Sequence, residues 1–224
     1  MPQLTQTSEL GSLSYSLPDL QHEVTIHLAN SSDPVRRHLQ TGNQSHRILE
    51  VPVGSKWEPG AHWHEDYVEH IRVLRGRAKV WIDGTEQELG PGQEAVFRLF
   101  DVHNFRRAEA ASGDVLLIEE WVDGEDGSKE IFFRNAFSIV RDVENFGGLP
   151  MAFLRFFVLC AYRDNHIAFC PPATPRWLQR LLTSCIFGVI VAVGKIGGWR
   201  TWYEEYTPPE LRALAAQRSG RKEQ

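Results

Sequence analysis

The chain has 224 residues and a formal net charge of −5, and 42% of its residues are hydrophobic, including 7 Trp and 12 Phe. This length suits one main domain with an appendage, and the many aromatic residues can fill a core or line a small-molecule pocket. A net acidic chain gives no electrostatic reason to expect a nucleic acid as a partner.

Residues 1–44 are polar and weakly patterned, which predicts an N-terminal arm with one short strand at Val24–Leu28. The chain starts without a basic segment followed by an apolar run, so we expect no secretory signal and a cytoplasmic protein. The three cysteines show no C-x-x-C spacing and lie in or beside apolar runs, which predicts buried free thiols.

Residues 45–142 contain short apolar runs separated by turn signals. Asp83-Gly84 is typical of a hairpin turn, and Gly90-Pro91-Gly92 marks a second turn. The predicted strands are 47–53, 69–74, 77–82, 95–99, 104–107, 115–122 and 130–140. Short strands without an intervening helix predict a mainly β fold, either an antiparallel sandwich or a small barrel.

The pattern changes to helical over residues 147–218. Leu149–Tyr162 predicts a mostly buried helix, and a second helix is expected from Pro175, with Thr174 as its N-cap, to about Lys195. Thr207-Pro-Pro-Glu210 has capping-box spacing and predicts a short third helix.

The second helix contains an uncharged run of 14 residues, 181–194, which is shorter than the roughly 20 apolar residues of a membrane span. Two interpretations stay open for the helical extension. It packs on the barrel or on a partner subunit, or it makes membrane contact through residues 149–197.

Four residues of metal-ligand type lie within the β region. His62 and His64 share a face if their segment is extended, because side chains alternate along a strand. Glu69 follows five residues later, and His103 lies in another strand-like stretch. Imidazoles and a carboxylate brought together by neighbouring strands predict a metal site.

The spacing of these residues resembles the two motifs of the cupin superfamily. His62-x-His64-x4-Glu69-x6-Gly76 is similar to the first motif, and Gly92-x10-His103 is similar to the second. The resemblance covers about residues 46–125 and implies a double-stranded β-helix barrel in which the four residues hold a metal. The usual Pro, Gly and Asn of the second motif are replaced by Arg98, Phe100 and Arg107, so no pocket specificity is carried over.

Three imidazoles and one carboxylate suit Fe(II), which we favour, and also Zn, Mn, Ni or Co. With octahedral coordination, four protein ligands leave two positions for water, dioxygen or a chelating substrate. We therefore expect a metal-dependent enzyme acting on a small, apolar organic metabolite in specialised metabolism. The reaction is either oxygen-dependent, as in a dioxygenase, or a metal-assisted isomerisation, cyclisation or lyase reaction.

The alternative is a non-catalytic cupin that binds or senses a ligand, with or without a membrane. A homodimer is expected from the N-terminal arm and the apolar helices. Candidate substrate-binding residues are Tyr67, Trp81, Arg98 and Trp121. The sequence does not identify the catalytic acid or base.

Overall fold

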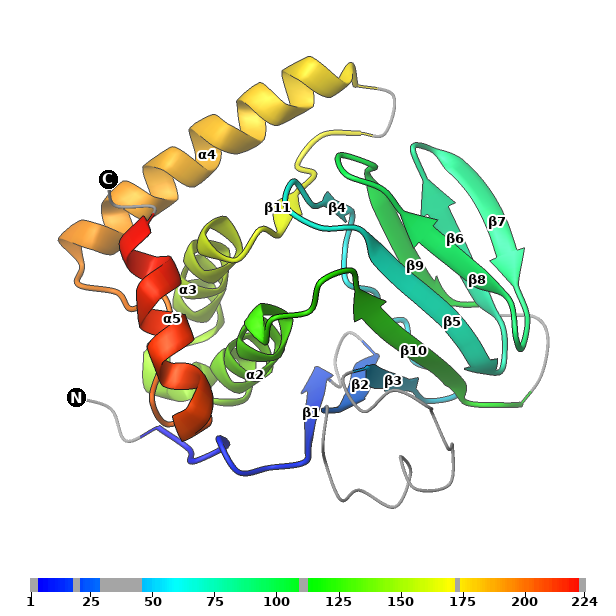
Figure 1. The fold of residues 1–224 in the computed structure, drawn as a ribbon, viewed down its shortest axis with the longest axis horizontal. Coiled ribbons are helices and arrows are strands. Elements are labelled where there is room, and N and C mark those ends of the chain that lie inside the picture. The colour runs from blue at the N-terminus through cyan, green and yellow to red at the C-terminus, as the bar shows by residue number, and fades with distance from the viewer. Residues whose placement is uncertain (1–3, 18–20, 29–45, 109–112, 172–173, 222–224) are drawn as a thin grey trace. The chain divides into compact units, whose positions relative to one another are not determined.

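The structure is a computed structural model that describes residues 4–17, 21–28, 46–108, 113–171 and 174–221. It divides into two compact units, each with its own set of secondary-structure elements (Figure 1). One unit comprises Gly11–Glu125 and Cys170–Thr174, and the other comprises Met1–Leu10, Asp126–Phe169 and Pro175–Gln224.

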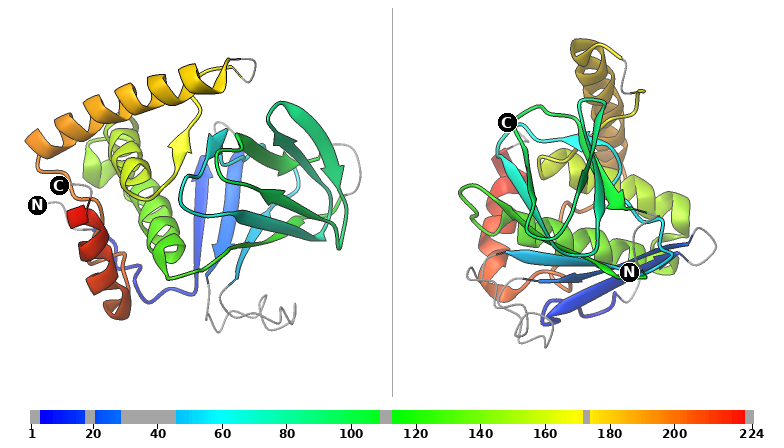
Figure 2. Two further views of the ribbon diagram at one scale, coloured as in Figure 1. Left: turned by 45° about the horizontal axis from the view of Figure 1, so that its top comes forward. Right: turned by 90° about the vertical axis from the view of Figure 1, so that its right-hand side faces the viewer.

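The first unit is built from two antiparallel sheets (Figure 2). One sheet has the order β1-β2-β3-β10-β5-β8, and the other contains β4-β9-β6-β7. The strands are β1 (Ser12–Leu17), β2 (His22–His27), β3 (Arg47–Val51), β4 (His62–Trp63), β5 (Glu69–Arg75), β6 (Ala78–Ile82), β7 (Thr85–Leu89), β8 (Glu94–Phe97), β9 (His103–Arg107) and β10 (Leu116–Val122).

Alternation of buried and partly exposed residues gives each strand an inner and an outer face. In β5 the buried residues are Glu69, Ile71 and Val73, with less buried residues between them. The predicted hairpin between β6 and β7 is confirmed. Its turn residues Asp83 and Gly84 both have positive φ, 51° and 82°, as a tight hairpin turn of the I′ type requires.

The predicted N-terminal arm is more structured than expected over its described residues. β1 pairs with β2, and β2 pairs with β3, so both strands belong to the first sheet. Residues before Gly11 belong to the other unit, where the Thr5 hydroxyl donates to Asp142 over 2.6 Å. The segment predicted as one arm therefore contributes to both units.

The strand predicted at 130–140 is wrong, because these residues lie in helix α2 (Ser128–Arg141). Most of α2 is buried, and its least exposed residues are Ile131, Asn135, Ser138 and Ile139. The other three lie three or four positions from Asn135, which is the spacing of one helix face. Glu130 accepts a 2.7 Å hydrogen bond from Arg134 one turn later. The strands of the first unit end at Val122 rather than near residue 142.

The regular elements described in the second unit are helices and one two-residue strand. Its elements are α2, η2 (Val143–Phe146), α3 (Leu149–Tyr162), β11 (His166–Ile167), α4 (Arg176–Ile196) and α5 (Pro209–Arg221). The predicted helix at 149–162 is confirmed. The N-cap of α4 is Pro175 and no side chain caps it, so the cap predicted at Thr174 is wrong.

The second unit has its own core, and several polar groups in it are paired. Tyr206 is fully buried, and its hydroxyl donates a 2.7 Å hydrogen bond to Asp142. Asn135 donates to Thr207 and accepts from the backbone N–H of Tyr203. These contacts join α2 to the segment before α5, which satisfies buried polar atoms that would otherwise be costly.

Candidate metal centre

The four predicted ligands come together at one end of the β unit. His62 lies in β4, and its register partner in β9 is His103. Glu69 is the first residue of β5, and His64 follows β4 in the connection to it. The ligand-type atoms of all four residues lie within 4.8 Å of one another.

The separations inside this cluster match those of ligands on one ion. His64 Nε2 lies 2.9 Å from Glu69 Oε2, and His103 Nε2 lies 3.8 Å from Glu69 Oε1. With metal–ligand bonds of about 2.1 Å, adjacent ligand atoms of an octahedral ion are about 3.0 Å apart and opposite ones about 4.2 Å. The donor set and its spacing therefore fit a divalent metal.

Hydrogen bonds to backbone carbonyls orient two of the histidines. Nδ1 of His62 donates to the Gly60 carbonyl over 2.8 Å, and Nδ1 of His103 donates to the Asp101 carbonyl over 2.9 Å. A carbonyl can only accept, so these contacts place the proton on Nδ1 and the lone pair on Nε2. This arrangement is typical of metal-binding histidines.

The cluster is almost completely buried. His62 is 5% exposed, Glu69 is 2% exposed, and His64 and His103 are each 1% exposed. A carboxylate in such a place is stable only with polar or cationic neighbours, because removing its water is costly. The imidazoles surrounding Glu69 provide those neighbours, and a cation among them would complete the charge balance.

Comparison with known proteins identifies the β unit. A family model described as a cupin domain matches residues 47–119. The chain contains a cupin domain. It is the same region that carries the histidines and the glutamate, and its two-sheet architecture is the double-stranded β-helix of that superfamily.

Solved structures resemble the cupin domain at low sequence identity. A putative sugar phosphate isomerase from Acidithiobacillus ferrooxidans shares 17% identity with a TM-score of 0.29, over 34% of this chain and 46% of that one. A predicted oxalate decarboxylase from Thermotoga maritima shares 16% with a TM-score of 0.37, over 54% and 97%. A cupin-2 domain protein from Rhodospirillum rubrum shares 17% with a TM-score of 0.37, over 56% and 78%.

These resemblances concern the fold. This chain spans about half the length of the first of those structures. A comparison with curated proteins found no match. What the cupin site does is therefore argued from its own residues.

Aromatic side chains pack against the ligands on two sides. The ring of Phe97, in β8, stacks on His103 with centroids 4.0 Å apart, and the ring of Tyr67 lies 4.6 Å from His64. Tyr67 was expected near the site from the sequence, whereas Phe97 was not. The register explains Phe97, because it lies directly opposite Glu69.

The two tryptophans predicted to line the pocket lie on the opposite faces of their strands. Trp121 is opposite His70, one residue out of phase with the Val122–Glu69 pair, and it stacks between His46 and His70. These residues therefore lie on the outer face of the sheet, and the predicted pocket role of Trp121 is wrong.

Trp81 is displaced from the site in the same way. It is opposite Asn104 in β9, whereas the neighbouring pair Ile82–His103 carries the ligand. The guanidinium of Arg106 lies 5.3 Å from the Trp81 ring, on the same outer face. The predicted pocket role of Trp81 is wrong as well.

The connection between β8 and β9 contains two of the residues that depart from the family motif. Arg98 is exposed, and its backbone N–H donates to Asp101 in a local turn. Phe100 has φ of 68°, and its N–H donates to the His64 carbonyl over 2.8 Å. This bond fixes the connection against a ligand residue.

The interior of the cupin domain also holds a charged group that the sequence did not reveal. Arg47 and Glu120 are each 1% exposed, and their charged groups lie 3.7 Å apart. Arg47 also donates to Glu125 over 2.8 Å. Because Glu120 is opposite Ile71, two residues from Glu69 along β5, this pair lies on the same sheet face as the metal ligands.

Proposed function

We propose that this protein is a metal-dependent cupin enzyme acting on a small organic molecule. The observation that carries the proposal is the buried cluster of His62, His64, Glu69 and His103, whose donor atoms lie within 4.8 Å of one another. Three imidazoles and one carboxylate form a borderline ligand set, without thiolate, that suits Fe(II), Mn(II), Co(II), Ni(II) or Zn(II).

The residues of the site would hold the ion without filling its coordination. Four donors leave two positions of an octahedral ion, and open positions distinguish a catalytic metal site from a structural one. The carbonyl contacts of His62 and His103 fix the direction of their Nε2 atoms, and Phe97 and Tyr67 keep an apolar, ordered wall around the imidazoles.

A bound divalent ion would supply Lewis acidity or, if it is iron, reactivity with dioxygen. Lewis acidity favours isomerisation, cyclisation or lyase chemistry on a carbonyl compound, whereas reactivity with dioxygen favours oxidation. Among these, we place Fe(II)-dependent oxidation first, because a nitrogen-rich, thiolate-free ligand set suits Fe(II) and would leave room for an oxidant and a chelating substrate. An apolar metabolite fits the aromatic wall best.

The experiment is metal analysis of protein purified without oxygen, followed by oxygen-uptake measurements with candidate chelating substrates. Stoichiometric iron together with substrate-dependent oxygen uptake supports an oxygenase. Stoichiometric zinc, manganese or nickel and product formation without uptake support an isomerase or lyase. Protein that holds no divalent metal after purification and after reconstitution would contradict the proposal.

The near-complete burial of the ligands favours a second candidate, a cupin that binds or senses a ligand without turnover. The two are separated by measuring ligand binding and product together. A ligand that raises the melting temperature of the metal-loaded protein, and is recovered unchanged, supports the binding protein. The homodimer stays a prediction, which sedimentation of the metal-loaded chain would check.

A further inference from the structure

Helix α4 exposes apolar side chains over most of its length. Trp177 is 69% exposed, Val189 65%, Leu181 53% and Val193 48%. These positions recur at intervals of four or eight residues, so they form one stripe along the helix. Surface helices of globular proteins normally carry polar residues on the side that faces water. The exposed side of α4 is apolar instead, which marks it as an interaction surface.

The face of α4 that is buried within the helical unit contains Gln179, Thr183, Phe187 and Gly194, so it is less apolar than the exposed stripe. Gln179 is 3% exposed and Thr183 is 1% exposed, and the Thr183 hydroxyl donates to the Ile167 carbonyl over 2.8 Å. Gly194 allows close approach to α3, where a Cβ would meet Val158 at 3.0 Å. Apart from Phe187, the buried residues of α4 are polar or small, whereas its exposed side is apolar, as in a helix that contacts lipid.

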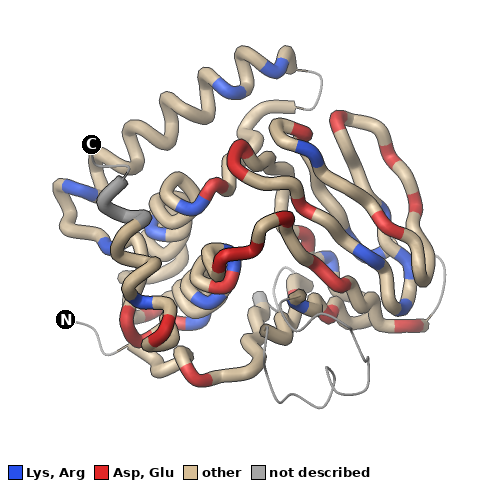
Figure 3. Tube along the Cα trace, in the orientation of Figure 1, with Lys and Arg blue, Asp and Glu red and all other residues tan. Residues whose placement is uncertain are grey.

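The charged side chains on α4 itself are all positive. The sequence contains no acidic residue between Asp164 and Glu204, although the whole chain has a net charge of −5. Arg176 and Arg180 lie at the start of the helix, and Lys195 lies near its end. Figure 3 shows this helix with basic residues at its ends and no acidic ones.

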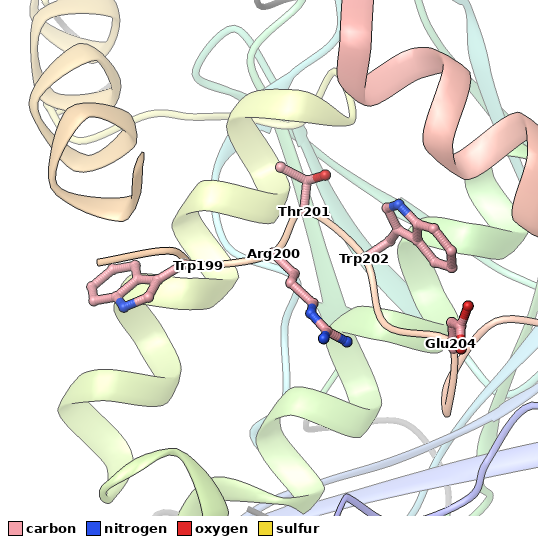
Figure 4. Close-up of a pocket in the computed structure, with 5 residues that line it drawn as sticks. All are labelled: Trp199, Arg200, Thr201, Trp202 and Glu204. Carbon is pink, nitrogen blue, oxygen red and sulfur yellow. The ribbon is translucent and has the colours of Figure 1, made fainter. Parts of the chain in front are cut away.

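Aromatic side chains accompany the basic residues at both ends. Trp177 is in the first turn, and Trp199 and Trp202 follow the last turn. A pocket there is lined by Trp199, Arg200, Thr201, Trp202 and Glu204. Figure 4 shows the two indoles on either side of Arg200. Tryptophan and arginine are the residues that concentrate at the level of lipid headgroups.

We propose that α4 binds the surface of an anionic lipid bilayer, with its apolar stripe in the headgroup–acyl boundary. The uncharged run 181–194 covers about 21 Å at 1.5 Å per residue, less than the roughly 30 Å of a hydrocarbon core. One side of α4 is also occupied by α3. Both features favour a helix lying in the interface over one that crosses the membrane.

Charge distinguishes lipid from a second copy of the chain as the occupant. In a dimer with two-fold symmetry through α4, Arg176 and Arg180 would face either themselves or Lys195 and Arg200, with no acidic residue of the helix to neutralise them. Anionic headgroups complement the same cations at both ends of the stripe.

The experiment is flotation of the full chain with vesicles of phosphatidylcholine alone or mixed with phosphatidylserine. We expect the protein to float with the mixed vesicles and far less with phosphatidylcholine. Val189→Glu should reduce binding about tenfold, because it puts a charge in the apolar stripe. Val53→Glu is the matched control, since Val53 is 55% exposed in the cupin domain and should leave binding unchanged.

Two further measurements test charge and orientation. Arg180→Gln and Lys195→Gln should each weaken binding to mixed vesicles about fivefold, the equivalent of about 1 kcal/mol per charge. Cys185 is exposed on α4, contrary to the buried thiol expected from the sequence. Its labelling by a maleimide should slow when mixed vesicles are added.

A wild-type protein that stays with the unbound fraction in both mixtures overturns the proposal. So does a dimer that Val189→Glu converts to a monomer without any vesicle binding, because the stripe is then a subunit interface. Metal content of Val189→Glu should equal that of the wild type, so this result is independent of the function proposed for the cupin site.

Discussion

Replacing His103 by alanine tests the metal centre most directly. The variant removes one of four donors and leaves the backbone of β9 intact, while Glu69 keeps His64 at 2.9 Å. The matched control is His70→Ala. His70 is next to Glu69 in sequence, but it lies on the outer face of the sheet and contacts Asp123 over 3.1 Å.

The expected magnitude follows from linkage between binding and folding. A metal present at about 100 times its dissociation constant stabilises the folded state by about 2.7 kcal/mol. Mutating a residue that only supports a metal ligand weakens metal binding by up to about 100-fold. Removing a ligand itself should therefore weaken metal binding at least ~100-fold. At the same free metal concentration the stabilisation of the variant then falls to about 0.4 kcal/mol or less.

The assay is thermal unfolding of chelator-treated protein with and without added metal, supported by elemental analysis. At about 2–4 °C per kcal/mol for a chain of this size, the wild type and His70→Ala should gain roughly 5–10 °C from metal, and His103→Ala about 1 °C. Loss of the His103–Phe97 stacking also lowers the metal-free melting temperature, so only the metal-dependent difference is compared.

A full metal-dependent shift in His103→Ala would refute the assignment of His103 as a ligand. An equal loss of the shift in both variants would mean that the region as a whole, and not the ligand set, controls metal binding. Either result would remove the basis for assigning these four residues as the ligand set.

Three other predictions concern stability. Burial raises the pKa of the Cys160 thiol to about 12, so the unfolded state loses its proton first. Stability should then fall by about 1.4 kcal/mol per pH unit as pH rises from about 9 to 12, and urea unfolding of Cys160→Ala should show a smaller slope. Arg47→Met should lower the free energy of unfolding by about 3–5 kcal/mol, because it leaves the Glu120 carboxylate buried without its partner. Adding Glu120→Gln should recover part of this loss, because it removes the buried charge. Fully additive effects in the double variant would show that the two groups do not interact. Gly76→Ala should lower the free energy of chemical unfolding by about 1–3 kcal/mol more than Gly54→Ala. Both glycines have positive φ, but only a Cβ at position 76 would meet a backbone oxygen, at 2.7 Å. Equal losses in the two variants would contradict this close approach.

The ligand set could be predicted from the sequence because its signal is local. His62, His64 and Glu69 are close along the chain, and the motif spacing through Gly76 to His103 identifies the fourth ligand. The turn at Asp83-Gly84 was predictable for the same reason, since positive φ at both positions demands those residue types.

Residues that depend on pairing between strands could not be placed. Alternation along β10 shows that Trp121 and Val122 face opposite sides, but only the register with β5 shows that Val122 shares the face of Glu69. The same holds for Trp81 and for Phe97, whose contact with His103 requires β8 to pair with β5 and β9 to lie across the interior. Non-local register is a property of the sheet, and no single segment carries it.

The helix at 128–141 was missed for a related reason. Its Ile, Phe and Val content is typical of strands, and strand propensity is easily overridden by tertiary packing. Ile131 and Ile139 lie on one helix face with Asn135 between them. Because Asn135 is polar, the sequence does not show that this face is buried. The Asn135 amide donates to the Ile131 carbonyl one turn earlier, but its other partners, Thr207 and Tyr203, are about 70 residues away in sequence.

Phe100 has a strained backbone conformation that a hydrogen bond to a candidate ligand residue helps to hold. The related motif has glycine at this position, and the backbone here keeps the left-handed conformation that glycine favours, with φ of 68°. For a residue with a Cβ this conformation costs about 1–2 kcal/mol. The compensating contact is the hydrogen bond from the Phe100 N–H to the His64 carbonyl, which ties the connection before His103 to another ligand. Strain of this kind persists only where surrounding contacts determine the backbone, as they do beside this cluster.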